Sequence, residues 1–332
     1  MPKLTYNEIQ SELERILKKI GFVTEKASLL SKIFAENNLL GKESHGLNRF
    51  PGFVGAIKRK NIFIESDPEL VSSFQALEQW DGNQGAGPLS AMFSVERACK
   101  LADKFGIGCV ALRNTNHWMR GGSYGWRAAE LGYISICWTN AKPTMPPWGS
   151  TEIRLGNNPF VISVPYKPDP IVFDAALTQY SYGTLEVLNR KGEKLKYDGG
   201  FDRNGNLTKD PGEILETQRA LPIGLWKGSG LSLMLDILAS VMSGGKSSFQ
   251  IRQQGTESKA SQVFIAVKSG TVNDLSWVEN IIEEIVNDFH QSLPENGKQI
   301  FYPGEQSSIN KAGNLKSGIQ VEPELWEQIK AM

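Results

Sequence analysis

The chain has 332 residues, of which 40% are hydrophobic and 22% charged, as in ordinary soluble globular proteins. Its 36 basic and 36 acidic residues give a formal net charge of zero, which argues against nucleic acid or an anionic membrane as the main partner. Neither a signal peptide nor an apolar run of ~18 residues is recognisable, and the three cysteines lack C-x-x-C spacing. The sequence therefore predicts a cytoplasmic protein with buried free thiols.

The first 60 or so residues predict a small helical unit. Residues 7–20 carry apolar side chains on one helical face, and Gly21 ends that helix. Thr24 is the expected N-cap of a second helix that runs to about Leu40. Along its length this second helix places Leu29, Leu30, Ile33, Phe34 and Asn37 at helical spacing.

Residues beyond this unit predict alternating strands and helices, and hence an α/β or α+β fold. Strands are expected at 77–81, 107–113, 133–139, 160–165, 171–176 and 263–267. Helices are expected at 88–105, 123–131, 275–291 and 322–331. A surface hairpin is expected at 197–209, and a loop followed by a helix buried on most sides at 221–245.

Common nucleotide and metal motifs are missing from the sequence. No Walker A motif is present, and no G-x-G-x-x-G follows a strand. The glycines of "GNQGAG" at 82–87 have the wrong order, so a plain lead into a helix is favoured over a phosphate loop. His45, His117 and His290 lack the spacing of metal ligands, so no metal site is predicted, and His290 is expected to be a solvated helix residue.

The segment "SHGLNRF" at 44–50 is the first candidate for chemistry. If it is helical, His45 and Arg49 share one face. Two groups that can both be cationic do not stabilise each other, which favours a functional reason for the pair. Arg49 could hold a substrate carboxylate, and His45 could pass a proton to a neighbouring carbonyl oxygen.

Two further segments carry candidate groups. "RNTNHWMRGGSYGW" at 113–126 combines His117 and Arg120 with aromatic side chains and glycines, which suits a polyhydroxylated anionic ligand. The alternative is an ordinary surface loop with aromatic anchors. Asp174 ends the apolar run "PIVFD", where it could fix the tautomer of His45 or cap a following helix.

Six segments in this order resemble one known family: "SHGLNRF", "NHWMRGGSYGW", "CWTNAKPTMPPWGS", "RLGNNPF", "DGGFDRNGNLTKDPG" and "LWKGSGLSLMLD". That family is the malate/L-lactate dehydrogenase superfamily of NAD(P)H-dependent oxidoreductases, and the resemblance runs nearly end to end. It implies a non-Rossmann cofactor-binding fold with a mixed sheet, and typically a homodimer. We divide the chain into an N-terminal helical unit, 1–70, packed with 295–332, and a cofactor- and substrate-binding region at 71–294, with bounds good to ~10 residues.

The resemblance implies roles residue by residue. His45 matches the family's proton donor, with Asp174 as its catalytic partner, and Arg49, His117 and Arg120 are expected to bind substrate. NADH, or alternatively NADPH, is expected to contact three segments: Pro170, Ile171, Val172, Phe173, Asp174, Ala175 and Ala176; Trp226 and Lys227; and Gly304, Glu305 and Gln306. Many relatives carry His where this chain has Glu305, and "HFG" where it has "HWMRGG". The second departure fits a branch that reduces a diketo sugar acid and argues against simple malate or lactate.

Three alternatives stay open at this point. The chain could reduce another 2-oxo acid or an imino acid within the same family. It could also be a sugar-acid-binding protein without catalysis, although a pure binder has little need of His45 beside Arg49. A cofactor-free isomerase that uses His45 as acid and base is the third.

Overall fold

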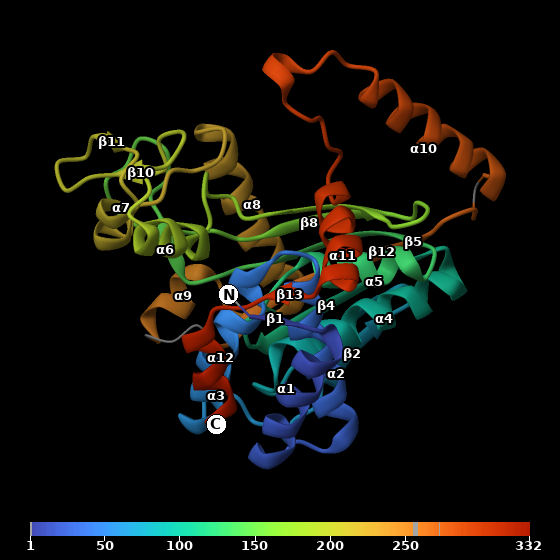
Figure 1. Cartoon of the computed structure of the whole chain (residues 1–332). Helices are drawn as coiled ribbons and strands as arrows, with labels where there is room; N and C mark the ends of the chain where they lie inside the picture. The colour runs from blue at the N-terminus through green and yellow to red at the C-terminus, as the bar shows by residue number, and fades with distance from the viewer. Residues whose placement is uncertain (1, 255–257, 272) are drawn as a thin grey trace.

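The computed structural model describes residues 2–254, 258–271 and 273–332. Within these residues, the largest sheet has seven strands in the order β2-β3-β4-β12-β5-β8-β9 (Figure 1). Their bounds are β2 (Glu69–Phe74), β3 (Leu77–Asp81), β4 (Ile107–Thr115), β12 (Ala260–Lys268), β5 (Tyr133–Thr139), β8 (Phe160–Val164) and β9 (Ile171–Ala175). Among the described strands of this sheet only β3 and β4 run parallel, whereas a Rossmann sheet is mostly parallel. The predicted non-Rossmann α/β fold with a mixed sheet is confirmed.

Side chains that alternate along the central strands build a core on each face of this sheet. Val110 and Phe264 pack with α4 (Gly87–Phe105) and α5 (Gly122–Glu130) on one face. Their neighbours Ala111 and Val263 pack with α8 (Trp226–Ser243) on the other. Because both faces are covered, the central strands are apolar throughout, which is why the sequence marks them so clearly.

A separate core holds the N-terminal helices together. It joins α1 (Tyr6–Ile20), α2 (Thr24–Leu39), α3 (Phe50–Lys58) and the C-terminal α12 (Pro323–Lys330). Strand β1 (Lys3–Leu4) also pairs with β13 (Ile319–Gln320), so both chain ends lie in the same part of the molecule (Figure 1). The division into 1–70 with 295–332 and 71–294 stays a prediction, since residues of the second region, such as Ala86 and Met119, also belong to this core.

Most predicted helix ends are confirmed, but the start of the second helix is not. Gly21 and Gly106 end α1 and α4 in the left-handed conformation. Thr24, however, is the first residue of α2, and the N-cap is Val23, which makes no side-chain cap hydrogen bond. The predicted N-cap is therefore off by one residue, and α2 begins without a side-chain cap.

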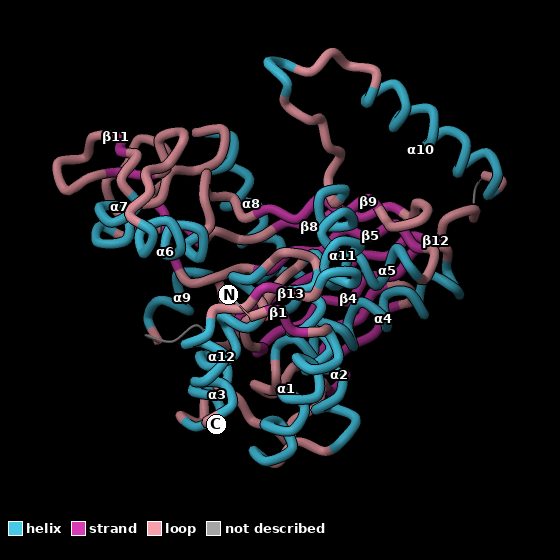
Figure 2. Tube along the Cα trace, viewed as in Figure 1, coloured by secondary structure: helices cyan, strands magenta, loops and turns pink. Residues whose placement is uncertain are grey.

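The remaining elements frame the sheet (Figure 2). A lobe beside it contains α6 (Tyr182–Lys191), α7 (Pro211–Thr217) and the predicted hairpin, formed by β10 (Gly200–Phe201) and β11 (Leu207–Thr208). The predictions for 197–209 and for the lead into α4 are thus confirmed. Shorter elements are β6 (Pro143–Met145), β7 (Leu155–Gly156), α9 (Ser248–Gln253) and η3 (Glu295–Gly297), and α11 (Glu305–Ser317) was not predicted.

The prediction that the helix within 221–245 is buried on most sides is wrong. One side of α8 faces the sheet through Leu235 and Ala239, but most of its other apolar side chains are exposed, and Val241 is 72% exposed. The predicted helix at 275–291 is α10 (Leu275–His290), which stands away from the body and has Val286 as its one buried residue (Figure 1). No helix in the described part of the chain is long and apolar enough to cross a membrane.

Candidate active site

The His45 segment is not one helix. Two single 3-10 turns, η1 (Glu43–His45) and η2 (Leu47–Arg49), are separated by Gly46, so the expected helical face shared by His45 and Arg49 does not exist. Asn38 at the end of α2 explains the break, because its Oδ1 accepts a hydrogen bond from Leu47 N at 2.7 Å. A Cβ atom on Gly46 would collide with that same oxygen, so glycine is required there.

His45 faces the second histidine of the site. The His45 and His117 ring centroids are 6.4 Å apart and the rings are nearly parallel, at 14°. Ser44 Oγ lies 3.0 Å from His45 Nδ1, and Met119 N donates to His117 Nδ1 at 3.0 Å. When the Ser44 hydroxyl donates to Nδ1, the proton of a neutral His45 sits on Nε2.

Positive groups surround His45. Burial, followed by the charges of the neighbouring His117, Arg49, Arg120 and Lys42, lowers the pKa of His45 to about 3. With no ligand bound, the imidazole is therefore neutral at pH 7. A site with this excess of positive charge favours a ligand that carries negative charge.

Arg120 is the most deeply placed of these cations. It is 4% exposed, and neither Nε nor Nη1 makes a hydrogen bond to any described residue. Asp174 Oδ2 lies 3.5 Å from Arg120 Nε and accepts a hydrogen bond from Gly122 N at 2.9 Å. A buried guanidinium with unused donors points to a ligand, because native proteins rarely leave such groups unpaired.

Asp174 therefore lies with Arg120 and Gly122 rather than with His45. No hydrogen bond joins Asp174 to His45 among the described residues, so the direct contact expected from the sequence is not formed. The alternative of a helix cap fails as well, because Asp174 lies within β9 and Ser181 caps α6.

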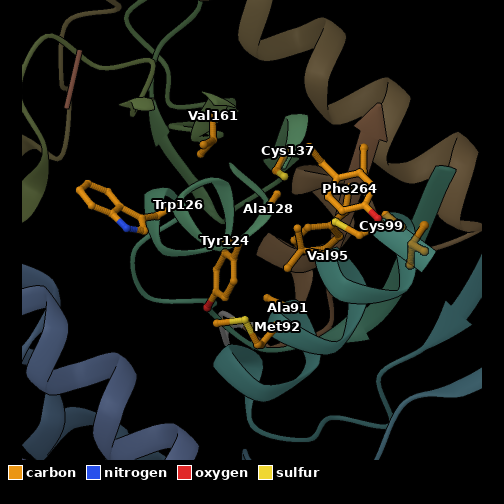
Figure 3. Close-up of a cluster of buried hydrophobic side chains, with 14 of the residues drawn as sticks. Ala91, Met92, Val95, Cys99, Tyr124, Trp126, Ala128, Cys137, Val161 and Phe264 are labelled. Atoms are coloured by element: carbon orange, nitrogen blue, oxygen red, sulfur yellow. The ribbon is translucent and has the colours of Figure 1, made fainter. Parts of the chain in front are cut away.

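The aromatic side chains of the 113–126 segment do not face a ligand. Trp118 and Tyr124 are fully buried in the core between α4, α5 and the sheet, and Figure 3 shows Tyr124 beside Ala91 and Met92. The expectation that the aromatic rings recognise a ligand is wrong, because they anchor the loop to the core. Of this segment, His117 and Arg120 stand beside His45, where their charges act on it.

Two of the expected cofactor segments lie side by side. In β9, Val172 N donates to Pro303 O at 2.9 Å, which places Pro170–Ala176 against Gly304 and the start of α11. Gly304 has a φ of 98°, and a Cβ there would lie 3.0 Å from Val172 N, so only glycine fits this close approach. Glu305 accepts from Tyr302 N at 3.0 Å and lies 3.0 Å from His290 Nε2, so His290 has a partner.

The third segment follows the other end of β9. Ile223 N donates to Leu177 O at 3.0 Å, and Thr178 forms a bridge with Pro222. This contact leads directly into α8, whose first residues are Trp226 and Lys227, and Trp226 is 65% exposed. The structure therefore joins Gly304 directly to β9, whereas Trp226 and Lys227 are connected to it only through the contacts of Pro222 and Ile223 with the chain after β9.

Lys42 is a site residue that the sequence reasoning missed. Loss of hydration near neighbouring protein lowers the pKa of Lys42, and the positive charge of Arg120 lowers that pKa as well. The negative charge of Asp174 acts in the opposite direction. The sequence does carry a signal for Lys42, because it is a third group that can be cationic, beside His45 and Arg49, and stands three residues before His45. A hollow of about 70 Å³ lies between the His45 segment and α6, and it is lined by Ser44, Asn48, Arg49, Gly183, Glu186, Val187 and Arg190. A larger cavity of about 190 Å³ between α2, α4, α5 and α11 is lined by none of the expected site residues.

A family model for malate/L-lactate dehydrogenase matches residues 4–330. The chain belongs to the malate/L-lactate dehydrogenase family. It is therefore an oxidoreductase that uses a nicotinamide cofactor, and the absence of G-x-G-x-x-G is explained by the family's different fold. The chain is 41% identical to 2,3-diketo-L-gulonate reductases of Citrobacter koseri and Klebsiella pneumoniae, over 99% of this chain and 100% of each relative.

Solved structures of the family share the fold. Malate dehydrogenase from Entamoeba histolytica superposes with a TM-score of 0.94 at 24% identity, covering 99% of this chain and 96% of that one. Sulfolactate dehydrogenase from Methanocaldococcus jannaschii gives 0.89 at 29% identity, with the same coverage of 99% and 96%. These family members carry different substrate names on one fold, so the substrate has to be argued from the site.

Proposed function

We propose that the protein reduces 2,3-diketo-L-gulonate to 3-dehydro-L-gulonate with NADH. The observation that carries this proposal is the cationic site itself: His45 is surrounded by Lys42, Arg49, His117 and Arg120, and Arg120 is buried with unused donors. The 41% identity to reductases of this name over the full chain supports the same substrate. A sugar acid supplies the negative charge that this site needs.

The residues act in the following order. Arg49 holds the C1 carboxylate, while His117 and Arg120 donate hydrogen bonds to the hydroxyl and carbonyl oxygens. The bound carboxylate offsets the neighbouring cations and thereby raises the pKa of His45, which takes up a proton from solvent. His45 Nε2 then gives that proton to the oxygen at C2 as the carbonyl becomes an alcohol. Asp174 fixes Arg120 and the start of α5.

The bound nicotinamide supplies the hydride that forms the new C–H bond at C2. The residues that would hold the nicotinamide cofactor are Pro170–Ala176, Trp226 with Lys227, and Gly304–Gln306. Their arrangement fits such a group, because the backbone at Gly304 approaches β9 closely with no side chain between them, which leaves backbone groups of both segments at the surface that would hold it. We propose NADH rather than NADPH as the preferred form, with NADPH as the alternative.

A substrate comparison tests this proposal. Purified protein is given NADH with 2,3-diketo-L-gulonate, pyruvate or oxaloacetate, and the loss of NADH absorbance is followed. We expect the highest kcat/KM with the diketo sugar acid. Faster turnover of a simple 2-oxo acid or an imino acid would assign the chain to another branch of the family. Binding of the sugar acid without turnover of any substrate would favour a non-catalytic binding protein.

We also propose that the protein is a homodimer. The exposed apolar side chains of α8 and those of α10 are two apolar surfaces without a partner among the described residues, and a helix such as α10 is marginal in water without packing. A second copy can cover both helices at once by symmetry. The residues concerned are Leu231, Leu233, Met234, Ile237, Leu238 and Val241 in α8, and Leu275, Trp277, Ile285 and Phe289 in α10.

Sedimentation equilibrium tests the dimer. The wild-type protein is expected to have twice the chain mass of 36.7 kDa. Leu238→Asp should shift the equilibrium toward monomer, because it places a charge within the apolar surface. Leu207→Asp, on the exposed hairpin, serves as the control and should stay dimeric. A monomeric wild type at micromolar concentration would rule the dimer out.

A cytoplasmic location completes the proposal. Cys99, Cys109 and Cys137 are free thiols. Burial raises the pKa of Cys137 to about 12 and that of Cys109 to about 11, so they are unreactive structural residues. Free thiols of this kind are typical of a reducing compartment.

A further inference from the structure

Asn37, near the C-terminal end of α2, is a polar side chain with 0% exposure. Its Nδ2 donates to the carbonyl oxygen of His45 at 3.0 Å, and its Oδ1 accepts from Ser123 Oγ at 3.1 Å. The orientation of this amide follows from chemistry, because the His45 carbonyl can only accept. Both ends of the amide are thus used, one on each side of the candidate active site.

We infer that Asn37 is a positioning residue that holds the His45 turn against the end of α5. The inference rests on the proposed role of His45 as proton donor. Single 3-10 turns such as η1 are weakly stable alone, so the backbone of His45 needs an external partner. Asn37 supplies that partner from a long, well-packed helix whose neighbouring residues Phe34 and Ala35 are fully buried.

The same amide reaches the other half of the site. Ser123 is the second residue of α5, and Gly122 before it donates to Asp174, which faces Arg120. Asn37 therefore connects the backbone of the proton donor to the helix end that carries the Asp174–Arg120 pair. A displacement of either part by a fraction of an ångström would change the distance between His45 and the bound substrate, and misplacement of ~1 Å can cost ~10²-fold in rate.

The end of α2 is itself fixed from the C-terminal part of the chain. Asn314 Nδ2 donates to Leu39 O at 2.9 Å and Asn310 Nδ2 to Leu40 O at 3.4 Å, so α11 satisfies carbonyls that a helix end leaves free. Gly41 has a φ of 72° and lies where a Cβ would collide with Asn310. The helix end that carries Asn37 is therefore held in place by α11, so Asn37 can in turn fix the position of His45.

Two variants of Asn37 separate positioning from mere stability. Asn37→Ala removes both hydrogen bonds, and we expect kcat to fall about 10- to 100-fold with the Kd for NADH nearly unchanged. Asn37→Asp keeps an acceptor for Ser123 but sets a carboxylate oxygen against the His45 carbonyl. A protonated Asp can donate to that carbonyl, so the ratio of variant to wild-type kcat should rise as the pH falls. A purely structural role would give no such recovery.

NMR signals of the histidine rings, measured without substrate, test this inference independently of the proposed function. The chain has three histidines, so histidine-selective isotope labelling gives three ring signals that single substitutions assign. In Asn37→Ala, and to a smaller degree in Ser123→Ala, the chemical shifts of the His45 ring should change while those of the His290 ring stay. Ser31→Ala, also fully buried in α2 but bonded locally to Ser28, should change nothing and is the matched control.

The outcomes are separable. If wild-type protein fails to reduce the sugar acid, the proposed function falls, while a selective shift of the His45 signals in the Asn37 variants still supports positioning. If Asn37→Ala does not fold, Ser123→Ala and Asn37→Asp provide the same readout. Folded Asn37 variants with wild-type His45 signals and wild-type kcat would overturn the inference.

Discussion

Replacing His45 by Asn is expected to lower kcat by about 10²- to 10⁴-fold, since this is the usual contribution of a positioned acid. Asn keeps a hydrogen-bond donor of similar reach but cannot deliver a proton. The side chain contacts Ser44 rather than the segments expected to hold the cofactor, so binding of NADH should change only a few-fold. Steady-state kinetics and a fluorescence titration with NADH give the two quantities separately.

The His45→Asn result also distinguishes the rival roles of this residue. Loss of NADH binding in a variant that unfolds at the wild-type temperature would mean that His45 holds the cofactor. Unchanged kcat would remove it from the mechanism and would leave Arg120 and Lys42 as the polarising groups.

Replacing Arg120 by Met is expected to lower kcat/KM for the sugar acid by about 10²- to 10³-fold, mainly through KM. The guanidinium is 4% exposed and has unused donors, and removing one partner of a buried, hydrogen-bonded charge pair between protein and ligand costs about 2–5 kcal/mol of binding. Met fills a similar volume without charge, so packing is largely kept. The kinetic constants are measured with the sugar acid, and the thermal midpoint is measured on the same preparation.

Arg127→Met is the matched control for Arg120. It lies in α5, the helix that begins just after Arg120, and its Nε pairs with Glu96 at 2.9 Å on the surface, away from His45. A surface pair of this kind is worth about 0–1 kcal/mol, so kcat/KM should stay within a few-fold of wild type. Equal losses in the Arg120 and Arg127 variants would show that any change in or just before α5 is damaging, and the specific role of Arg120 would be refuted.

Much of the fold could be predicted because its elements carry strong periodic patterns. Strands β4 and β12 are apolar on both faces, and such short apolar runs predict central strands. Helix α1 has a single apolar face and is ended by Gly21. Helix α11 was missed because its sequence, EQSSINKAGNLKS, has few apolar residues. Its place is set by tertiary contacts, such as those of Asn310 and Asn314 with the end of α2, which no local pattern encodes.

The exposed face of α8 shows a second limit. A helix that is apolar nearly all round can be buried within its own chain or against another one, and the sequence pattern is the same in both cases. Leu235 and Ala239 do pack on the sheet, while Met234 and Val241 lie outside. Only the three-dimensional structure separates the two situations.

The candidate site was found in part through residues of rare type. Four of its residues stand out in the sequence: His45, Arg49, His117 and Arg120. The predicted contact of Asp174 with His45 was wrong, because the pairing of Asp174 with Arg120 depends on how β9 lies against α5. Asn37 did leave a signal: it stands at an apolar position of the second helix, beside Ile33 and Phe34 in the helical pattern. A polar residue on a buried stripe needs partners, and here they are the backbone of His45 and the hydroxyl of Ser123.

The most direct test of the central claim is to reduce 2,3-diketo-L-gulonate with NADH that carries deuterium at both C4 positions, and to locate the label in the product by NMR. We predict one deuterium bonded to C2 for each NADH oxidised, with the hydroxyl proton taken from solvent. Label at another carbon, or NADH oxidation without label in the sugar acid, would contradict hydride transfer to C2 with His45 as the proton donor.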